Sequence, residues 1–247
     1  MLFFVAMKKI AHILTSTCFI LLAINSYSQS QFSGWLATFN SYKTGKKTSI
    51  HNDIQLRSSD DIKHMQTFLF RTGLNVHVRK NMTATAGYAF ISNRRTVNTV
   101  TGYAPEHRIW EQFIITHKIK TLATTHRFRL EQRFISKSKV VNNELENDGH
   151  VYANRFRYFM RNMLPLKKQE TFKKGMFVVL QDEVFVNIGN TANVNGQFFD
   201  QNRLLISTGY RINPKMDIEL GYLNQYIEGR TSNTHNHVVQ LGTYLRL

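Results

Sequence analysis

The sequence predicts an all-β fold, an antiparallel transmembrane β-barrel of about 10–12 strands that follows a cleaved signal peptide. Three observations lead to this prediction. Apolar and polar residues alternate along most of the chain, the first 28 residues have the layout of an export signal, and short connections alternate with long ones. Alternation with a period of two is typical of a strand whose two faces meet different surroundings. We therefore expect a signal peptide over residues 1–28 and one barrel domain over residues 29–247.

The amino-terminal segment has the three parts of a secretory signal. Lys8 and Lys9 supply a basic start, and residues 13–24 form an apolar stretch that is too short to span a bilayer. Small side chains precede the expected cleavage site ahead of Gln29. The single cysteine, Cys18, leaves with this segment, so the mature chain is expected to lack disulfides and cysteine-based sites.

The final strand shows the alternation most clearly, because the pattern continues to the last residue. Val239, Leu241 and Thr243 share one face with the two leucines that follow them. An apolar outer face on an end strand suits a closed barrel in lipid, where no sheet edge is left unpaired. The alternative is the last strand of a soluble β-sandwich.

Eleven segments read as strands, although bacterial barrels normally have an even number. We expect ten strands if the first segment lies outside the wall, which we slightly favour, or twelve if one more strand exists. The segments are residues 32–42, 50–57, 68–78, 82–92, 106–120, 126–135, 152–164, 176–188, 203–212, 218–222 and 238–247.

The connections between these segments alternate in length. Outer-membrane barrels have short periplasmic turns and longer outer loops. With the last residue on the periplasmic side, every connection fits that rule. The short ones are 44–47, 80–81, 121–123, 165–175 and 213–215, and the long ones are 58–63, 93–105, 136–150, 189–197 and 228–235.

The chain is strongly basic, with a formal net charge of +16. A basic surface often indicates nucleic-acid binding, but an exported chain does not normally meet nucleic acid. We expect outer-membrane lipid and lipopolysaccharide as partners, because their headgroups are anionic. After the signal there is no apolar run long enough for a transmembrane helix. The sequence does not predict an oligomeric state.

Gln240, Gly242, Leu245 and Leu247 follow the order polar, glycine, hydrophobic, hydrophobic at fixed spacing. This order resembles the carboxy-terminal assembly signal of Gram-negative outer-membrane barrels, whose final residue is usually aromatic rather than leucine. The resemblance implies recognition by the barrel assembly machinery and a location in the cell outer membrane.

Several short strings occur in a fixed order along nearly the whole mature chain. They are Gly34-Trp35, Arg71-Thr72-Gly73-Leu74, Gly87-Tyr88-Ala89, Trp110-Glu111-Gln112, residues 126–134, Arg155-Phe156-Arg157-Tyr158, Asn202-Arg203-Leu204 and residues 221–225. Together they resemble an uncharacterised family of Gram-negative outer-membrane β-barrels that is known only as a domain of unknown function. The resemblance implies an outer-membrane barrel and no particular activity.

Charged residues on the inner faces of the strands are the candidate functional residues. Neighbouring strands lie about 4.8 Å apart, so these charges can interlock across the lumen. We favour a structural or binding barrel whose arginine-rich lumen is plugged by ion pairs. The alternative is a narrow anion-preferring pore, since arginines outnumber acids. The predicted set is Glu111, Arg127, Arg129, Glu131, Arg133, Arg155, Arg157, Arg161 and Arg203.

Enzymatic activity is not expected from this sequence. His51 and Asp53 share a face, as do Asp217 and Glu219, but no spacing among them requires catalysis. No nucleophile elbow, phosphate loop or zinc motif is present, so we expect neither a metal nor a cofactor. An outer-membrane hydrolase is the second alternative to the plugged barrel.

Overall fold

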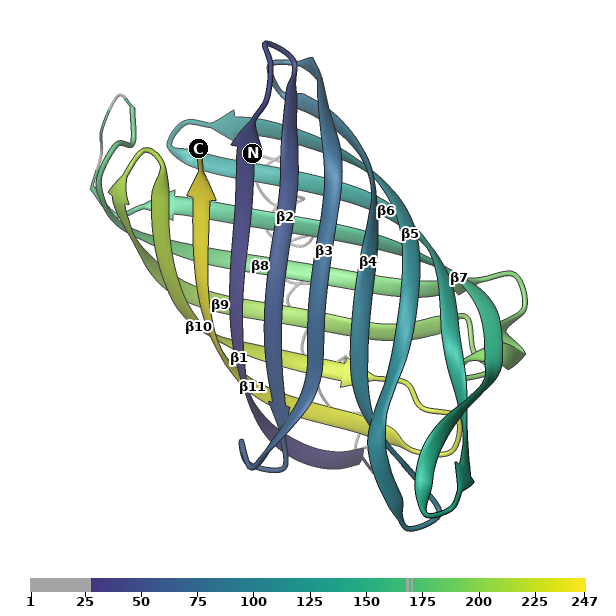
Figure 1. Cartoon of the computed structure of the whole chain (residues 1–247). Helices are drawn as coiled ribbons and strands as arrows, with labels where there is room; N and C mark the ends of the chain where they lie inside the picture. Colours follow the sequence, from purple (N-terminus) through teal and green to yellow (C-terminus); the bar gives the residue numbers. More distant parts are fainter. Residues whose placement is uncertain (1–27, 168, 170) are drawn as a thin grey trace, which may run out of the picture.

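The computed structural model describes residues 28–247 except 168 and 170, and these residues form a closed barrel of eleven strands (Figure 1). The predicted all-β barrel is thereby confirmed. The predicted signal peptide lies outside the described residues apart from Ser28, the first residue of β1. The strands are β1 (Ser28–Lys43), β2 (Thr48–Ser59), β3 (His64–Arg79), β4 (Met82–Val97), β5 (Val100–Ile119), β6 (Leu122–Val141), β7 (Glu144–Pro165), β8 (Gly175–Ile188), β9 (Phe199–Asn213), β10 (Met216–Ile227) and β11 (Asn233–Arg246).

The barrel closes through a parallel pair, β1 with β11, whereas all other neighbours are antiparallel. In a meander with an odd number of strands the first and last strands point the same way, so closure must be parallel. The preference for ten or twelve strands was therefore wrong, because the segment 32–42 is part of the wall. The backbone N–H of Lys43 donates to the carbonyl of Leu247 at 2.6 Å, and the N–H of Leu247 donates to Ser41 at 2.8 Å.

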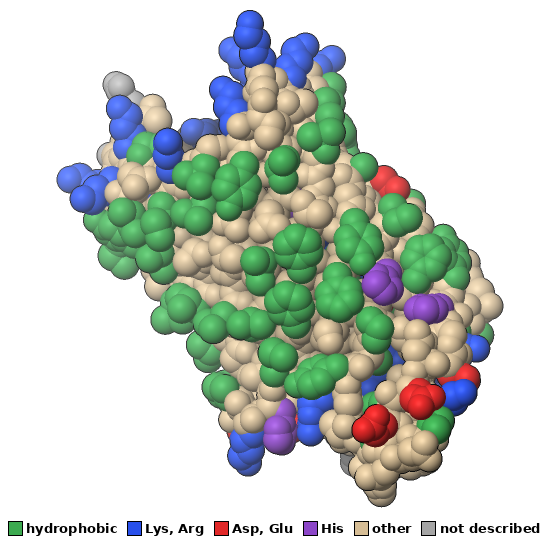
Figure 2. Space-filling model, in the orientation of Figure 1, with side chains coloured by type: hydrophobic (Ala, Val, Ile, Leu, Met, Phe, Trp, Pro, Cys, Tyr) green, Lys and Arg blue, Asp and Glu red, His purple; other side chains and the backbone are tan. Residues whose placement is uncertain are grey.

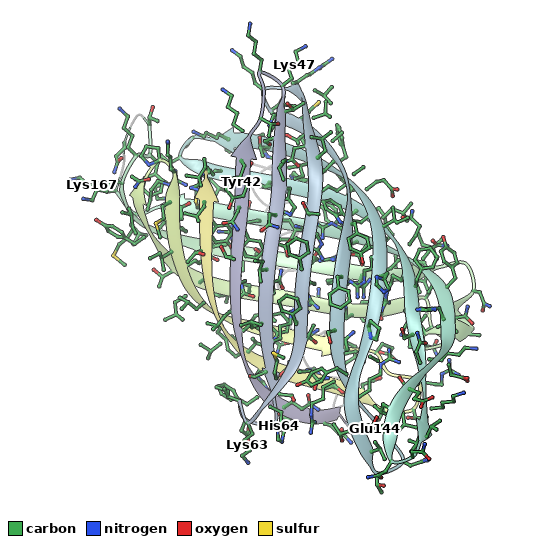
Figure 3. The ribbon with its side chains drawn as sticks, in the orientation of Figure 1. Tyr42, Lys47, Lys63, His64, Glu144 and Lys167 are labelled. Carbon is green, nitrogen blue, oxygen red and sulfur yellow. The ribbon has the colours of Figure 1, made fainter. Side chains whose placement is uncertain are left out.

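The connections lie at two rims of the barrel. The C-terminal rim carries Leu247 and the turns 44–47, 80–81, 120–121, 166–174 and 214–215; the opposite rim carries Ser28 and the connections 60–63, 98–99, 142–143, 189–198 and 228–232. Figure 3 shows Lys47 and Lys167 at the C-terminal rim, and Lys63, His64 and Glu144 at the opposite rim.

Two of the predicted long loops are in fact strands that end in tight turns. Strands β4 and β5 continue to a turn at 98–99, and β6 and β7 continue to a turn at 142–143. Asn98, Asn142 and Asn143 have φ values of 56°, 50° and 63°, a left-handed conformation that asparagine tolerates and that tight hairpin turns require. The difference in length between the connections at the two rims therefore comes partly from hairpins that project at the opposite rim.

The wall has an apolar outside and a polar inside. Outward-facing side chains such as Leu74, Ile109, Leu180 and Ile206 are about half exposed, and Figure 2 shows hydrophobic side chains scattered over the visible wall. Inward-facing side chains are mostly polar or charged and buried. Two small apolar clusters interrupt this polar filling; they are Trp35, Leu205, Leu223 and Val238, and Leu69, Ala89, Ile91 and Trp110.

Trp110 fills the lumen beside two inward-facing glycines. A Cβ atom at Gly87 would lie 2.7 Å from the Trp110 ring and 2.2 Å from the carbonyl oxygen of Thr72, and a Cβ at Gly73 would lie 2.8 Å from the same ring. These glycines give the indole its space, and Trp110 is completely buried.

Among the described residues no helix has the length and apolar character needed to cross a membrane.

The predicted assembly-signal residues lie on or directly after β11. Gln240 pairs with Trp35 on β1, and Gly242 pairs with Ala37. A Cβ at Gly242 would meet Tyr244 at an ordinary distance of 3.6 Å, so packing in the finished barrel does not require glycine there. Leu245 pairs with Met216, and Leu247 is exposed at the C-terminal rim.

Candidate functional site

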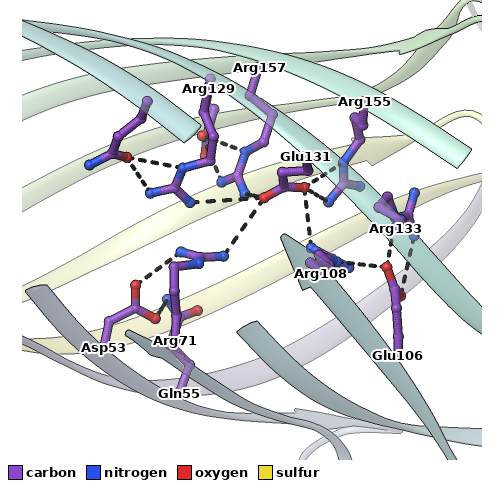
Figure 4. Close-up of polar contacts among 12 residues, drawn as sticks. Asp53, Gln55, Arg71, Glu106, Arg108, Arg129, Glu131, Arg133, Arg155 and Arg157 are labelled. Carbon is purple, nitrogen blue, oxygen red and sulfur yellow. Dashed lines mark hydrogen bonds and ion pairs between the residues drawn. The ribbon is translucent and has the colours of Figure 1, made fainter. Parts of the chain in front are cut away.

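The lumen contains a continuous network of arginines and carboxylates (Figure 4). Eight of the nine predicted lumen residues take part in it or border it. They are Arg127, Arg129, Glu131 and Arg133 on β6, Arg155, Arg157 and Arg161 on β7, and Arg203 on β9. Strict alternation on β6 and β7 places these side chains on the same face.

Glu131 is the centre of this network and has no exposed surface. Its Oε2 accepts hydrogen bonds from Arg155 Nη2 at 2.7 Å and from Arg108 Nη1 at 3.3 Å. Its Oε1 accepts from Arg157 Nη1 at 2.6 Å. Guanidinium groups of Arg71 and Arg129 lie 3.9 Å from the same oxygen. One carboxylate therefore binds arginines from four strands.

Two further buried carboxylates extend the network toward the rims. Glu106 Oε1 accepts from Arg108 Nε and from Arg133 Nε, both at 2.6 Å. Glu183 Oε1 accepts from Arg127 Nη2 at 2.6 Å and from Arg157 Nη2 at 2.7 Å. Arg108 bridges Glu106 and Glu131, and Arg157 bridges Glu131 and Glu183, so moving either of these two arginines disturbs more than one ion pair.

Further ion pairs lie on the rest of the inner wall, and the pair at Asp53 joins the network because Arg71 also contacts Glu131. Asp53 accepts from Arg71 Nη1 at 2.9 Å and contacts His51 Nε2 at 3.2 Å. Arg161 donates to Glu219 on β10. Asp217 accepts from Arg211 Nε at 2.7 Å and from Arg246 Nη2 at 2.5 Å, which ties β11 to β9.

Glu111 does not belong to this network, and its predicted place was wrong. It lies exposed on the outer wall, where Gln132 Nε2 donates to its carboxylate at 3.1 Å. The large apolar Trp110 occupies the lumen, so the inner positions of β5 are Glu106, Arg108, Trp110 and Gln112. Because an apolar residue was not expected in the lumen, Glu106 and Arg108 were also not identified from the sequence, although both are separated from Gln112 by an even number of positions.

Arginines outnumber carboxylates in the described part of the lumen. With the half-exposed Arg246 at the rim left out, the eleven arginines are Arg57, Arg71, Arg108, Arg127, Arg129, Arg133, Arg155, Arg157, Arg161, Arg203 and Arg211, and the seven carboxylates are Asp53, Glu106, Glu131, Glu183, Asp200, Asp217 and Glu219, an excess of four positive charges.

The wall also holds a serine–histidine contact that sequence reasoning did not single out. Ser49 Oγ lies 3.1 Å from His77 Nε2, and His77 Nδ1 lies 3.1 Å from the hydroxyl of Thr83. Ser49 is only 3 % exposed and also accepts a hydrogen bond from Asn75. A nucleophile must reach its substrate, and this serine is enclosed by its partners. Within residues 28–247, the two omitted positions apart, no group of three or more potential metal ligands is found.

The fold and its filling define a class of protein: a closed eleven-stranded barrel with an apolar outer wall and a lumen filled by buried ion pairs. Residues 32–236 match the family described as "Protein of unknown function (DUF2490)", and the chain belongs to this family. The predicted resemblance to a domain of unknown function is thus confirmed. No curated protein and no solved structure matches the chain.

Proposed function

We propose that this protein is a barrel of the cell outer membrane whose lumen is closed by its ion-pair network, with a structural or binding role. The observation that carries the proposal is the shared coordination of Glu131, which accepts hydrogen bonds from Arg108, Arg155 and Arg157 of the two neighbouring strands. Arg71 of the non-adjacent strand β3 also lies 3.9 Å from this carboxylate. Buried charges are stable only when they are paired and hydrogen-bonded, and such a network holds its side chains in one arrangement.

The surface supports the membrane part of the proposal. Large exposed hydrophobic side chains occur on all eleven strands or beside them, whereas buried polar side chains fill the inside. A protein in water would not keep so many apolar side chains outward. The shortest strands, β2 and β10, have 12 residues each, more than the roughly 9–11 that a tilted transmembrane strand needs.

The two rims differ in charge in a way that suits anionic headgroups. Among the described residues of the turns at the C-terminal rim none is acidic, whereas the opposite rim exposes Asp60, Asp61, Glu144, Glu146 and Asp148. Lysines near a bilayer surface are attracted to anionic lipid. The exposed cations at the C-terminal rim are Lys43, Lys46, Lys47, Arg79, Lys80, Lys118, Lys120, Lys167, Lys173, Lys174 and Lys215, and Figure 2 shows basic side chains gathered there.

A narrow anion-preferring pore is the second candidate, and the arginine excess in the lumen favours it. Two cavities inside the lumen, of about 160 and 80 Å³, border the network. The hydrolase alternative has only the enclosed contact of Ser49 with His77 in its favour. We therefore place both alternatives below the closed barrel.

The test combines location with conductance. We expect the protein in the outer-membrane fraction, with a gel mobility that changes between unheated and boiled samples, and no current steps in a planar lipid bilayer. The double variant Glu131→Ala/Arg157→Ala removes the central pairs and should conduct, which makes it the positive control. A soluble periplasmic protein would contradict the membrane placement. Steady conductance of the unaltered barrel would favour the pore.

Lipid hydrolysis separates the remaining alternative. The purified barrel is expected to release no fatty acid from phospholipid vesicles, and Ser49→Ala is the matched variant. Hydrolysis that disappears in Ser49→Ala would establish the hydrolase instead.

A further inference from the structure

A small cavity inside the lumen, beside the network of arginines and carboxylates, has an unusual lining. Its volume is about 80 Å³, and no carboxylate lines it. Water occupies about 30 Å³ per molecule in the liquid, so this space holds a few waters or one compact ion. Six arginines line it, namely Arg57, Arg71, Arg108, Arg155, Arg157 and Arg203.

Four of these six arginines bind a carboxylate elsewhere, but Arg57 and Arg203 do not. Arg57 Nη2 donates to Gln55 Oε1 at 2.6 Å, and Arg203 Nη2 donates to Gln201 Oε1 at 3.2 Å. Both partners are neutral amides. Within the described chain neither guanidinium lies within 4.0 Å of an acidic oxygen, and the buried Nε of each has no hydrogen-bond partner.

Aromatic rings hold these two guanidiniums in place. The Cζ atom of Arg57 lies 4.2 Å from the centroid of the Trp35 ring, and that of Arg203 lies 5.1 Å from the same ring and 4.8 Å from Phe185. Stacking on an aromatic face orients a guanidinium but leaves its charge uncompensated. Two buried, oriented and unneutralised cations beside a cavity form a preorganised anion site.

We propose that this cavity binds a compact oxyanion, with Arg57 and Arg203 as its principal ligands. Guanidinium forks match the geometry of phosphate and carboxylate oxygens, and an anion with two charges would neutralise both arginines. The volume excludes a nucleotide or a sugar phosphate. Arg57 and Thr67 also line a 320 Å³ cavity that extends to Asp60 and Arg94 at the opposite rim, so the two cavities adjoin at these residues.

This inference does not rest on the proposed location or on a closed lumen. It concerns the folded barrel, which can be purified in detergent and titrated, whereas conductance and fractionation test the other proposal. If the barrel binds the anion and also conducts, only the proposed function is overturned. If the barrel does not conduct and does not bind the anion, only this inference is overturned.

Trp35 serves as the reporter, because the chain has only two tryptophans. In the Trp110→Phe background, fluorescence of Trp35 is followed while inorganic phosphate replaces chloride at constant ionic strength. We expect a saturable change. Arg57→Gln/Arg203→Gln should weaken phosphate binding by about tenfold or more, since each charge-assisted hydrogen bond contributes at least that much. Arg79→Gln, an exposed arginine at the C-terminal rim, is the matched control and should leave binding unchanged.

A second measurement uses the unaltered barrel, so the inference remains testable if a variant fails to fold. Phosphate should raise its thermal midpoint in proportion to the logarithm of concentration above the dissociation constant, as for any ligand of the folded state. Acetate in place of phosphate distinguishes a carboxylate site from a phosphate site. The proposal would be overturned by a fluorescence change that does not saturate, or by an equal loss of phosphate affinity in Arg79→Gln. A thermal midpoint that responds identically to chloride and to both oxyanions would also overturn it.

Discussion

The exchange of Glu131 for glutamine tests whether the ion-pair network stabilises the barrel. Glutamine keeps the size of the side chain and one acceptor oxygen but removes the charge that three guanidiniums share at 2.6–3.3 Å. The lumen excess then rises from four positive charges to five. Breaking a fully buried ion pair by removing one partner typically costs about 3–5 kcal/mol, because the remaining charge is left uncompensated.

Unfolding in urea, followed by tryptophan fluorescence, measures this cost. With an m-value of about 3 kcal/mol/M, the midpoint should fall by roughly 1–1.7 M. Glu146→Gln makes the same chemical change at an exposed position of the β6–β7 hairpin and should shift the free energy of unfolding by less than about 0.5 kcal/mol. If Glu131→Gln behaves like Glu146→Gln, the network contributes little to stability and our reasoning about the lumen is refuted.

Three other predictions concern packing, assembly and the charged rim. Gly87→Ala should destabilise the refolded barrel by about 1–3 kcal/mol, because its Cβ would collide with Thr72 and Trp110. Gly242→Ala is the control and should leave the stability unchanged, so equal urea midpoints for the two variants would contradict this prediction. Deleting Leu245–Leu247 should lower the amount of protein in the outer membrane while secretion continues, and normal levels on fractionation would count against the assembly signal. Lys46→Glu/Lys47→Glu should weaken sedimentation with anionic vesicles but not with neutral ones, and unchanged binding would remove the lipid role of the C-terminal rim.

The sequence predicted the wall best where both faces of a strand have distinct surroundings. Strands β6 and β7 alternate arginine with aromatic residues, so Arg127 to Arg133 and Arg155 to Arg161 were placed correctly. Strand β5 was misread because Trp110, a large apolar side chain, faces inward. That placement depends on Gly73 and Gly87 of two other strands, which a pattern within one strand does not reveal.

The hairpins and the anion site show two further limits of sequence patterns. Within residues 93–105 and 136–150 only Ala104 and Ser136 are buried, so neither face of these strand ends is regularly buried and alternation fades although strand pairing continues. Arg57 and Arg203 are 146 positions apart, and they meet at Trp35 only because the sheet closes. Whether these two arginines lie beside the same ring depends on the shear of the finished barrel, which alternation alone does not specify.

The parallel closing pair has a consequence for the proposed insertion of this chain into a bilayer. Strands β1 and β11 run in the same direction, so Ser28 and Leu247 lie at opposite mouths. If the C-terminal rim faces the periplasm, a peptide inserted directly after Gln29 would be accessible to antibody on intact cells, and one fused after Leu247 would be shielded. Assembly would then have to carry the leading end of the mature chain through the outer membrane before the seam could form, whereas in an even-stranded barrel both ends stay on the periplasmic side.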